Sequence, residues 1–322
     1  MRQCAIVALL ALVAMASGAP GWVQPGRDGN DQGVWGFRDG IQVSLPRNRS
    51  PRGLINIYDE AICQTSHPLN FIAIEPVVHG TRGFSELEFS KLDHCAGKRL
   101  WSANIRDSQS SAAATAVAGV ITTSGTVEIL TVYIACEPFN NGAHVCIEVS
   151  FSSDAPREVG LRSFATPDSA PIEHCILTAT MGNYARLREL HLREGLVTSA
   201  ELWPTYTGND FAPHVEFALQ RLNRTRDGGM LVPATPDELN PAQSPAPGHW
   251  NFTGVRAAQY WRLPADEIAP ETLARVNGRY VYWRSRNPLP GGIAFENFEL
   301  QRNFRQGEIS IFGVTTNTAE LR

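Results

Sequence analysis

The chain has 322 residues, of which 43% are hydrophobic and 19% are charged, and its formal net charge is −4. These values describe a globular protein and argue against a basic nucleic-acid-binding protein, since no stripe of Lys and Arg with interleaved aromatic residues occurs. The body of the chain lacks a run of about 18 apolar residues, so we expect no membrane span after processing. The 27 Gly, 21 Pro and many aromatic residues favour short strands joined by turns.

The amino-terminal segment has the organisation of a secretory signal peptide. Arg2 provides a positive charge, an apolar run from Ala5 to Ala16 follows, and this run is too short to cross a bilayer. We expect residues 1–19 to be removed, with cleavage at the small residues after Ala16 or Ala19. The sequence therefore predicts a secreted protein, periplasmic or extracellular.

Export makes disulfides possible for the cysteines that remain after processing. Cys136 and Cys146 flank a turn sequence and lie symmetrically about Asn141, so a hairpin centred there would place them opposite each other. Cys63 and Cys95 are related in the same way across a longer segment. The sequence predicts a Cys136–Cys146 disulfide, with Cys63–Cys95 as a second candidate and buried free thiols as the alternative.

Apolar and polar residues alternate along most of the chain, as in segments 86–89 and 145–151. This pattern is typical of strands with one face buried, and the continuous apolar runs at 71–74 and 129–134 are typical of strands covered on both faces. Asn277-Gly278 is the strongest short signal for a hairpin turn. Strands do not alternate with helices, so we do not expect a parallel sheet.

These patterns predict an all-β fold, a large antiparallel β-sandwich of the jelly-roll or super-sandwich type with little helix. We expect an N-terminal linker over 20–33 and a single domain over 34–322. A Pro-rich stretch near 233–249 is expected to be a long surface loop, because strand signals resume directly after it. Segment 213–222 fits a helix or a strand equally well.

One predicted strand face is chemically unusual. If segment 176–192 is a regular strand, Tyr184, Arg186 and Arg188 lie on one face, with His191 close in sequence. Two guanidinium groups in succession can bind carboxylate or sulfate groups bidentately. These four residues are therefore candidate catalytic residues.

A second face follows the Asn277-Gly278 turn, where Tyr280, Tyr282 and Arg284 alternate with apolar residues and Trp261 is expected on a neighbouring strand. Aromatic rings beside arginine suit sugar rings, so these four are candidate substrate-binding residues. The alternative is a solvated surface, because Arg is the main cation of this chain and Tyr–Arg cross-strand pairs are common.

Glutamates offer a competing site. Hydrolysis of a glycosidic bond needs two carboxyl groups about 5–10 Å apart. Glu86 and Glu88, at alternate positions of a strand, would be separated by about 7 Å, and Glu296 and Glu299 form a second candidate pair. Outward-facing glutamates on an amphipathic strand are the alternative.

Five stretches carry a resemblance that covers most of the mature sequence: 51–55, 70–78, 82–88, 179–188 and 291–299. In these stretches the chain resembles a family of secreted bacterial β-sandwich proteins of uncharacterised function. The resemblance implies no particular activity. The wider likeness to lectin-like and jelly-roll polysaccharide-processing proteins is architectural, and a shared architecture does not imply a shared function.

Together these observations predict a secreted carbohydrate-active protein whose partner is a polysaccharide or oligosaccharide. The preferred reaction is β-elimination on an acidic polysaccharide, in which Arg186 or Arg188 neutralises the uronate carboxylate. Tyr184 or a nearby histidine, His191 or His174, takes the proton and returns it to the leaving oxygen. This reaction requires no cofactor, and the scattered histidines and cysteines predict no metal site. The alternatives are a glycoside hydrolase that uses a Glu pair and a non-catalytic carbohydrate-binding or envelope protein.

Overall fold

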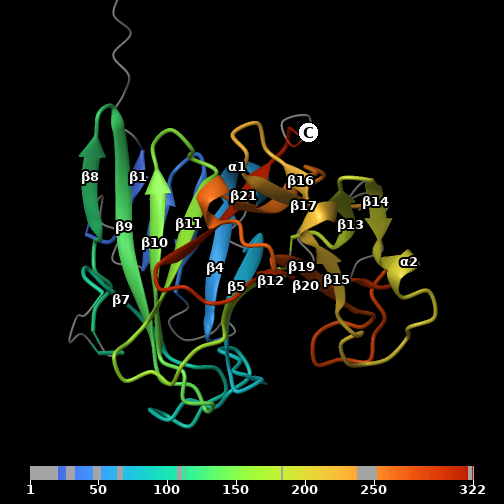
Figure 1. Cartoon of the computed structure of the whole chain (residues 1–322), viewed down its shortest axis with the longest axis horizontal. Helices are drawn as coiled ribbons and strands as arrows, with labels where there is room; N and C mark the ends of the chain where they lie inside the picture. Colours follow the sequence, from blue (N-terminus) through green and yellow to red (C-terminus); the bar gives the residue numbers. More distant parts are fainter. Residues whose placement is uncertain are drawn as a thin grey trace, which may run out of the picture.

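The structure, a computed structural model, describes residues 21–26, 33–45, 52–63, 68–106, 111–112, 114–182, 184–237, 252–317 and 321. These residues confirm the all-β prediction, because two large antiparallel sheets pack face to face as a β-sandwich (Figure 1). The predicted signal peptide, residues 1–19, lies outside the described residues. So does most of the Pro-rich stretch.

The first sheet contains ten strands in the described part of the chain. Its main path has the order β1-β2-β3-β4-β5-β12-β20-β19-β15, with β6 paired to β5. The strands are β1 (Trp22–Val23), β2 (Val34–Phe37), β3 (Ile41–Ser44), β4 (Leu54–Asp59), β5 (Asn70–Val78), β6 (Thr81–Arg82), β12 (His174–Met181), β15 (Val215–Ala218), β19 (Leu273–Arg279) and β20 (Ala294–Gln301).

The second sheet contains eleven strands in the same described ranges. Its path is β14-β13-β17-β18-β21-β11-β10-β9-β7, with β8 paired to β9 and β16 paired to β17. The strands are β7 (Leu100–Ala103), β8 (Val120–Ser124), β9 (Val127–Cys136), β10 (Val145–Ser152), β11 (Glu158–Ala165), β13 (Leu187–Leu192), β14 (Gly195–Thr198), β16 (Asn223–Arg224), β17 (Met230–Pro236), β18 (Ala258–Leu263) and β21 (Glu308–Thr315).

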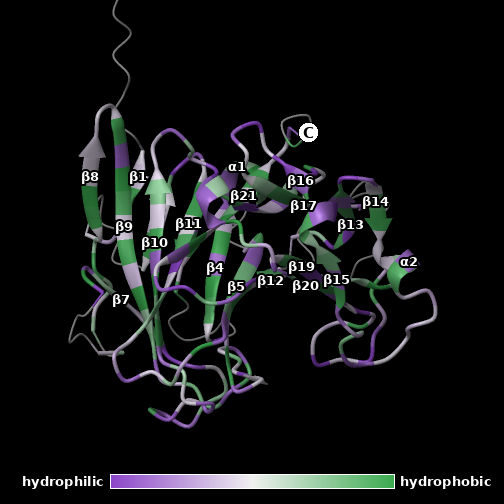
Figure 2. Cartoon of the chain, in the orientation of Figure 1, coloured by the Kyte–Doolittle hydropathy of each residue, from purple (hydrophilic) through white to green (hydrophobic). Residues whose placement is uncertain are grey.

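The core lies between the two sheets and is built from the inward side chains of both. Alternation is clear in β9, where Leu130, Val132 and Ile134 are buried and the residues between them are half-buried. Figure 2 shows hydrophobic residues concentrated along the strands and hydrophilic ones along the connections. Burying such a face contributes about 25 cal/mol per Å² of apolar surface, and this burial is what holds the two sheets together.

Among the described residues, helical structure is confined to single turns. These are α1 (Glu60–Cys63), α2 (Ser199–Leu202) and the 3₁₀ turns Leu219–Arg221 and Ala265–Glu267. In α2, Thr198 accepts a hydrogen bond from the backbone N–H of Glu201, whose side chain in turn accepts one from the N–H of Thr198. None of the helices that the structure describes has the length and apolar character needed to cross a bilayer.

Two segments near the expected domain limits contain strands. Trp22 and Val23, within the segment expected as a linker, form β1 and pair with Phe37 and Gly36. Pro233 and Pro236, at the start of the Pro-rich stretch, belong to β17.

The predicted disulfides are wrong, because none of the five described cysteines forms a disulfide. In the hairpin of β9 and β10, Cys146 faces Ala135, so the pairing is displaced by one residue from the symmetry assumed for Cys136 and Cys146. Successive side chains of a strand point to opposite faces. Cys136 therefore lies in the core between the sheets, whereas Cys146 lies on the other face of its strand.

Thiol accessibility should follow this arrangement. Cys95 is exposed, while Cys63, Cys136, Cys146 and Cys175 are buried, and burial raises the pKa of Cys63 to about 12. We expect a disulfide-exchange reagent to modify Cys95 in the folded protein and the other four only after unfolding in denaturant, without prior reduction. If a mass measurement after alkylation in denaturant finds two of these thiols unreactive, they form a disulfide, and the absence of disulfides among the described cysteines is contradicted.

The hairpin turn predicted at Asn277-Gly278 is also wrong, because both residues lie inside β19. A Cβ at Gly278 would lie 2.9 Å from side-chain atoms of Trp203 and Ile293, so glycine is needed here for close packing. The chain turns back later, near Arg284, whose φ is +54°.

Candidate functional site

The face of the first sheet that points away from the core carries a row of polar residues. Ile74, Leu177 and Phe298 point into the core. The residues that follow them, Glu75 in β5, Thr178 in β12 and Glu299 in β20, therefore point to the opposite face. Thr178 and Arg275 both pair with Glu299, so these side chains are neighbours across three strands.

An irregularity in β20 adds further polar groups to this outer face. Asn277 pairs with Asn297, but the next residue of β19, Gly278, pairs with Phe295, so Glu296 is an extra residue in the ladder. Phe295 and Phe298 both lie in the core although they are three residues apart. The β-bulge thus directs Glu296, Asn297 and Glu299 to the same side of the sheet, and such bulges commonly redirect side chains next to functional sites.

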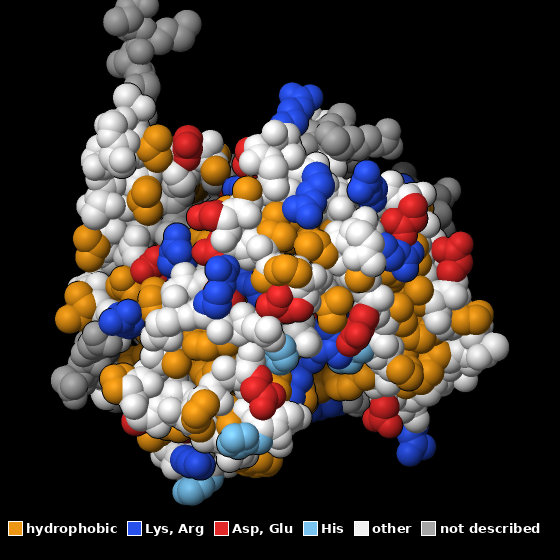
Figure 3. Space-filling model, in the orientation of Figure 1, with side chains coloured by type: hydrophobic (Ala, Val, Ile, Leu, Met, Phe, Trp, Pro, Cys, Tyr) orange, Lys and Arg blue, Asp and Glu red, His pale blue; other side chains and the backbone are white. Residues whose placement is uncertain are grey.

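A cavity of about 340 Å³ opens onto this face. Its walls come from the segment after β6, the segment before β15 and the outer face of the sheet. Figure 3 shows a hollow in the lower part of the view between these segments, with basic side chains at its base. The lining residues are Glu75, Arg82, Phe84, Glu86, Leu87, Phe211, Ala212, His214, Asn277 and Asn297.

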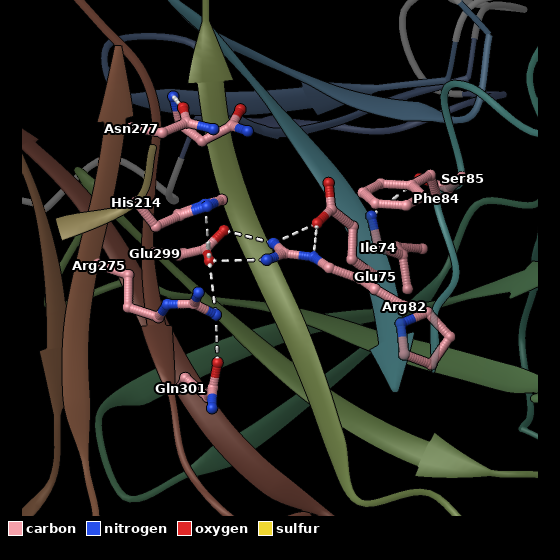
Figure 4. A network of polar contacts seen from close by, with 12 residues as sticks. Ile74, Glu75, Arg82, Phe84, Ser85, His214, Arg275, Asn277, Glu299 and Gln301 are labelled. Atoms are coloured by element: carbon pink, nitrogen blue, oxygen red, sulfur yellow. Dashed lines mark hydrogen bonds and ion pairs between the residues drawn. The ribbon is translucent and has the colours of Figure 1, made fainter. Parts of the chain in front are cut away.

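Arg82 links two buried carboxylates at the base of the cavity (Figure 4). Its guanidinium donates to both oxygens of Glu299, at 3.1 and 2.6 Å, and also to Glu75. The side chains of Glu75 and Glu299 are almost fully buried, while that of Arg82 is 16% exposed. On its other side, Glu299 lies 3.7 Å from Arg275 Nη1.

Two carboxyl groups that line the cavity have raised pKa values. Burial raises the pKa of Glu75 to about 8, with Arg82 acting in the opposite direction and Glu299 and Glu86 adding to the rise. Burial and the nearby Glu296 raise the pKa of Glu86 to about 7. Because Glu75 and Glu86 influence each other, they titrate as a pair that holds at least one proton near neutral pH.

Two further groups of the cavity have hydrogen-bonding capacity that the described residues do not use. Nε2 of His214 and Oδ1 of Asn297 are buried without a hydrogen-bond partner among these residues. His214 Nε2 is 3.6 Å from Glu299 Oε1, and burial lowers the pKa of this histidine despite the opposing effect of Glu299. An unpaired buried polar group costs about 1–3 kcal/mol, so a ligand that pairs with it gains that energy.

Phe211, which lines the cavity, has a second aromatic ring, Trp283, beside it. The Arg279 guanidinium lies 4.4 Å from the ring centres of both Phe211 and Trp283, and its Nε is 3.0 Å from Glu296. The Trp283 side chain is 44% exposed. An exposed indole held beside a polar cavity is a surface on which the C–H face of a sugar can stack.

The residues predicted for β-elimination are buried within the fold. Strand β12 ends at Met181, so the assumed alternation does not continue to Tyr184. The Tyr184 hydroxyl contacts Ile62 O and Val255 O, and its side chain belongs to the core. Arg186 and Arg188 are 2% and 5% exposed. The structure thus places these side chains inside the protein and not on a face open to substrate.

Arg188 connects β13 to the segment before β20. Its guanidinium donates to the carbonyl oxygens of Pro290, Gly292 and Ile293 and to the carboxylate of Asp237. Arg186 also donates to Pro290 O. These contacts indicate a structural role for both arginines.

We expect Arg188→Met to destabilise the fold by about 1–3 kcal/mol, because buried carbonyl oxygens lose their donors. Urea unfolding followed by tryptophan fluorescence measures this loss. Arg193→Met, at the exposed position just after the opposite end of β13, serves as the control and should change stability by less than about 0.5 kcal/mol. Equal stability of the two variants would contradict the structural role of Arg188.

The remaining predicted residues do not gather at one place. His191 Nε2 is 2.8 Å from Thr235 Oγ1 on the second sheet. Trp261 is fully buried and donates to Phe298 O. Tyr280 and Tyr282 are half-buried in the segment before the turn, where Arg284 is exposed at the tip. The predicted sugar-binding face of Trp261 with Tyr280, Tyr282 and Arg284 is therefore not formed.

The predicted glutamates do not form the expected pairs, Glu86 with Glu88 and Glu296 with Glu299. Glu86 lies in a turn and lines the cavity. Glu88 points elsewhere, because it accepts from the backbone N–H groups of Phe84 and Asn140 and is 3.1 Å from Lys98 Nζ. Glu86 is brought near Glu296 instead, and Glu299 is brought to Glu75 through Arg82.

A second cavity, of about 460 Å³, lies beside β7. Arg52 and Arg99 both bind Asp93 there, each at 3.0 Å. Asp93 is the one acidic residue among the described residues that line this cavity, so it lacks a carboxyl pair. No group of three or more His, Cys, Asp or Glu residues suited to a metal ion is found in the described ranges.

In comparisons with protein-family models, curated proteins and solved structures, the chain matches none. A functional conclusion therefore depends on the chemistry of the cavity itself.

Sequence reasoning missed several residues of this cavity: Arg82, His214, Asn277, Asn297 and Phe211. One signal was available, because Glu75 is a charged residue within the apolar segment 70–78 and Arg82 follows it after a short turn. A carboxylate in a buried strand requires a partner, and an arginine across the turn can supply one.

Proposed function

We propose that this protein hydrolyses glycosidic bonds in the cavity lined by Glu75 and Glu86. The observation that carries the proposal is that two carboxyl groups with raised pKa values face one cavity on a sheet surface. A carboxylic acid that keeps its proton near neutral pH can act as a general acid.

The two carboxyls would divide the chemistry of hydrolysis between them. The protonated group donates its proton to the glycosidic oxygen as the bond from that oxygen to the anomeric carbon breaks. The ionised group either takes a proton from the attacking water or bonds to the anomeric carbon, according to the separation of the two groups. Because the groups titrate together, the proton is assigned to the pair and not to Glu75 or Glu86 alone.

The arginines near the cavity already form ion pairs within the protein, and this favours hydrolysis over β-elimination. Elimination on a uronate requires a cationic group that is available to the substrate carboxylate. Arg82 is bound to Glu75 and Glu299, and Arg279 is bound to Glu296. These guanidinium groups are already neutralised by carboxylates of the chain.

The test is a screen of the purified protein against neutral and acidic polysaccharides with two readouts. Hydrolysis releases reducing ends, whereas elimination also produces an unsaturated product that absorbs in the near ultraviolet. We expect reducing ends without that absorbance. Absorbance that increases with an acidic polymer, or the absence of either signal with every polymer, would overturn the proposal.

Export is part of the same proposal, since a polysaccharide is a substrate outside the cell. We propose that residues 1–19 direct secretion and are then removed. Sequencing the amino terminus of protein recovered from the periplasm or medium should find a chain that begins at residue 17 or 20, as expected from the two cleavage sites. Retention of the intact amino terminus inside the cell would contradict secretion.

A further inference from the structure

The unused hydrogen-bonding groups of the cavity point to the class of sugar it accepts. Asn297 lines the cavity and is 8% exposed, and its Oδ1 lacks a partner among the described residues. The backbone N–H of Asn297 is bound by Asn277 Oδ1, which fixes this part of the bulge. An amide oxygen can only accept hydrogen bonds, so it requires a ligand group that donates one.

His214 lies beside this position. It precedes Val215, which pairs with Val276, and this register places His214 next to Asn277 in the same row as Asn297. Burial lowers the pKa of His214, so the ring is neutral near pH 7. A neutral imidazole nitrogen can accept or donate, according to its tautomer. Hydroxyl groups both donate and accept, so the hydroxyls of one sugar unit can donate to Asn297 Oδ1 and pair with His214 Nε2.

The charges around the cavity disfavour an anionic ligand. Glu75 and Glu86 line it, and Glu296 and Glu299 lie behind them. The arginine between Glu75 and Glu299 is shared by both carboxylates. A ligand carboxylate would therefore meet acceptors and negative charge, with no unpaired guanidinium among Arg82 and Arg279 to receive it.

We propose that His214 and Asn297 form a subsite that binds hydroxyl groups of an uncharged sugar, next to the carboxyl pair. This inference rests on the proposed function for its substrate class, but it concerns binding and not bond cleavage. It makes His214 and Asn297 specificity-determining residues, and it predicts that an uronic acid is rejected at this position. A neutral sugar unit fits because its hydroxyls supply the donors that the cavity lacks.

The experiment measures binding with the full protein by titration calorimetry. The neutral probes are disaccharides of glucose, galactose, mannose or xylose. Each is compared with a disaccharide in which one unit is replaced by a uronic acid, and the glucose disaccharide is also compared with one that contains glucosamine. We expect at least one neutral disaccharide to bind, and its uronic acid counterpart to bind at least tenfold more weakly. This comparison needs no variant. Equal or tighter binding of the uronic acid or the glucosamine counterpart, or no binding of any neutral probe, would overturn the inference.

Variants then locate the subsite. We expect Asn297→Ala and His214→Ala each to weaken the neutral disaccharide about tenfold, the effect of losing one good hydrogen bond. Asn56→Ala is the matched control, because Asn56 is a buried asparagine of β4 in the same sheet that does not line the cavity. Circular dichroism establishes that each variant is folded. If both variants are folded and bind the neutral disaccharide with unchanged affinity, His214 and Asn297 do not form the subsite.

The outcomes separate this inference from the proposed function. Hydrolysis of both neutral and acidic substrates at equal rates would support the proposed function and overturn the subsite. Selective binding of a neutral disaccharide that depends on Asn297 and His214, without any hydrolysis, would support the subsite and overturn the proposed function.

Discussion

Replacing Arg82 by methionine should destabilise the protein by about 3–5 kcal/mol, the usual cost of removing one partner from a buried ion pair. The size follows from the geometry, because Arg82 is shared by the carboxylates of Glu75 and Glu299, which are 2% and 0% exposed. Without the guanidinium, Glu75 would lose its counter-charge, and Glu299 would keep only the more distant Arg275, at 3.7 Å. Urea unfolding monitored by circular dichroism measures the change in the free energy of unfolding.

The same variant should show a distinct dependence on pH. In the unmodified protein the pKa values of Glu75 and Glu86, about 8 and 7, lie above the ordinary value of 4.5. The folded state therefore binds more protons than the unfolded state in this range, so the contribution of these groups to stability falls as pH rises from about 4.5 to 8. In Arg82→Met the carboxyls lose their counter-charge, and we expect the fall to be steeper.

A combined variant provides the control. Replacing Glu75 and Glu299 by glutamine in the Arg82→Met background removes the uncompensated charges and should recover most of the lost stability. A loss below about 1 kcal/mol in Arg82→Met, outside the range expected for a buried pair, would mean that solvent reaches this network and that the ion pairs contribute little.

Replacing Glu86 by glutamine should reduce the rate of glycoside hydrolysis by about 10²–10⁴-fold, the usual contribution of a positioned general acid or base. Glutamine keeps the size of the side chain but cannot donate a carboxyl proton. The protein should remain folded, because burial disfavours the ionised form of Glu86. Release of reducing ends from the best neutral polysaccharide, measured as kcat/KM, is the readout.

The pH profile gives a second, independent readout for Glu86. In the unmodified protein kcat/KM should fall as pH rises through about 7 to 8, where the pair of Glu75 and Glu86 loses its last proton. This alkaline limb should change in Glu86→Gln, whereas Glu271→Gln, at an exposed position away from the cavity, should keep the unmodified rate and profile. Full activity in folded Glu86→Gln would remove Glu86 from the mechanism.

The sandwich architecture could be predicted from the sequence because strand periodicity and turn composition are local signals. Segments 71–74 and 145–151 illustrate this, since both are strands with the burial expected from their patterns. Errors arose where a position depends on one residue of register. Cys136 and Cys146 lie on opposite faces because the hairpin pairing differs by a single residue from the assumed symmetry.

The candidate site was only partly predictable for the same reason. Glu86, Glu296 and Glu299 are predicted from the sequence as candidate acid or base residues, and the structure places them in or beside the cavity, but no local pattern showed which of them would meet. The bulge at Glu296 and the contact of Arg82 with Glu299, 217 residues away in sequence, are tertiary features. Tyr184 and Arg188 were misplaced because their polar groups bind backbone carbonyls inside the fold, which alternation alone cannot distinguish from exposure.

The extra residue in β20 reverses the alternation of side chains along the strand. Before it an odd-numbered residue, Phe295, points into the core, and after it an even-numbered residue, Phe298, does so. Deleting Glu296 or Asn297 would make the ladder regular and would leave Phe295 and Phe298 in the core, because these two residues would then be two positions apart. The deletion would remove one of the two polar side chains that stand next to each other on the outer face, opposite Asn277. The extra residue therefore adds one polar group to the cavity without displacing a core residue, so a shorter strand can keep the packing between the sheets and still lose part of the site.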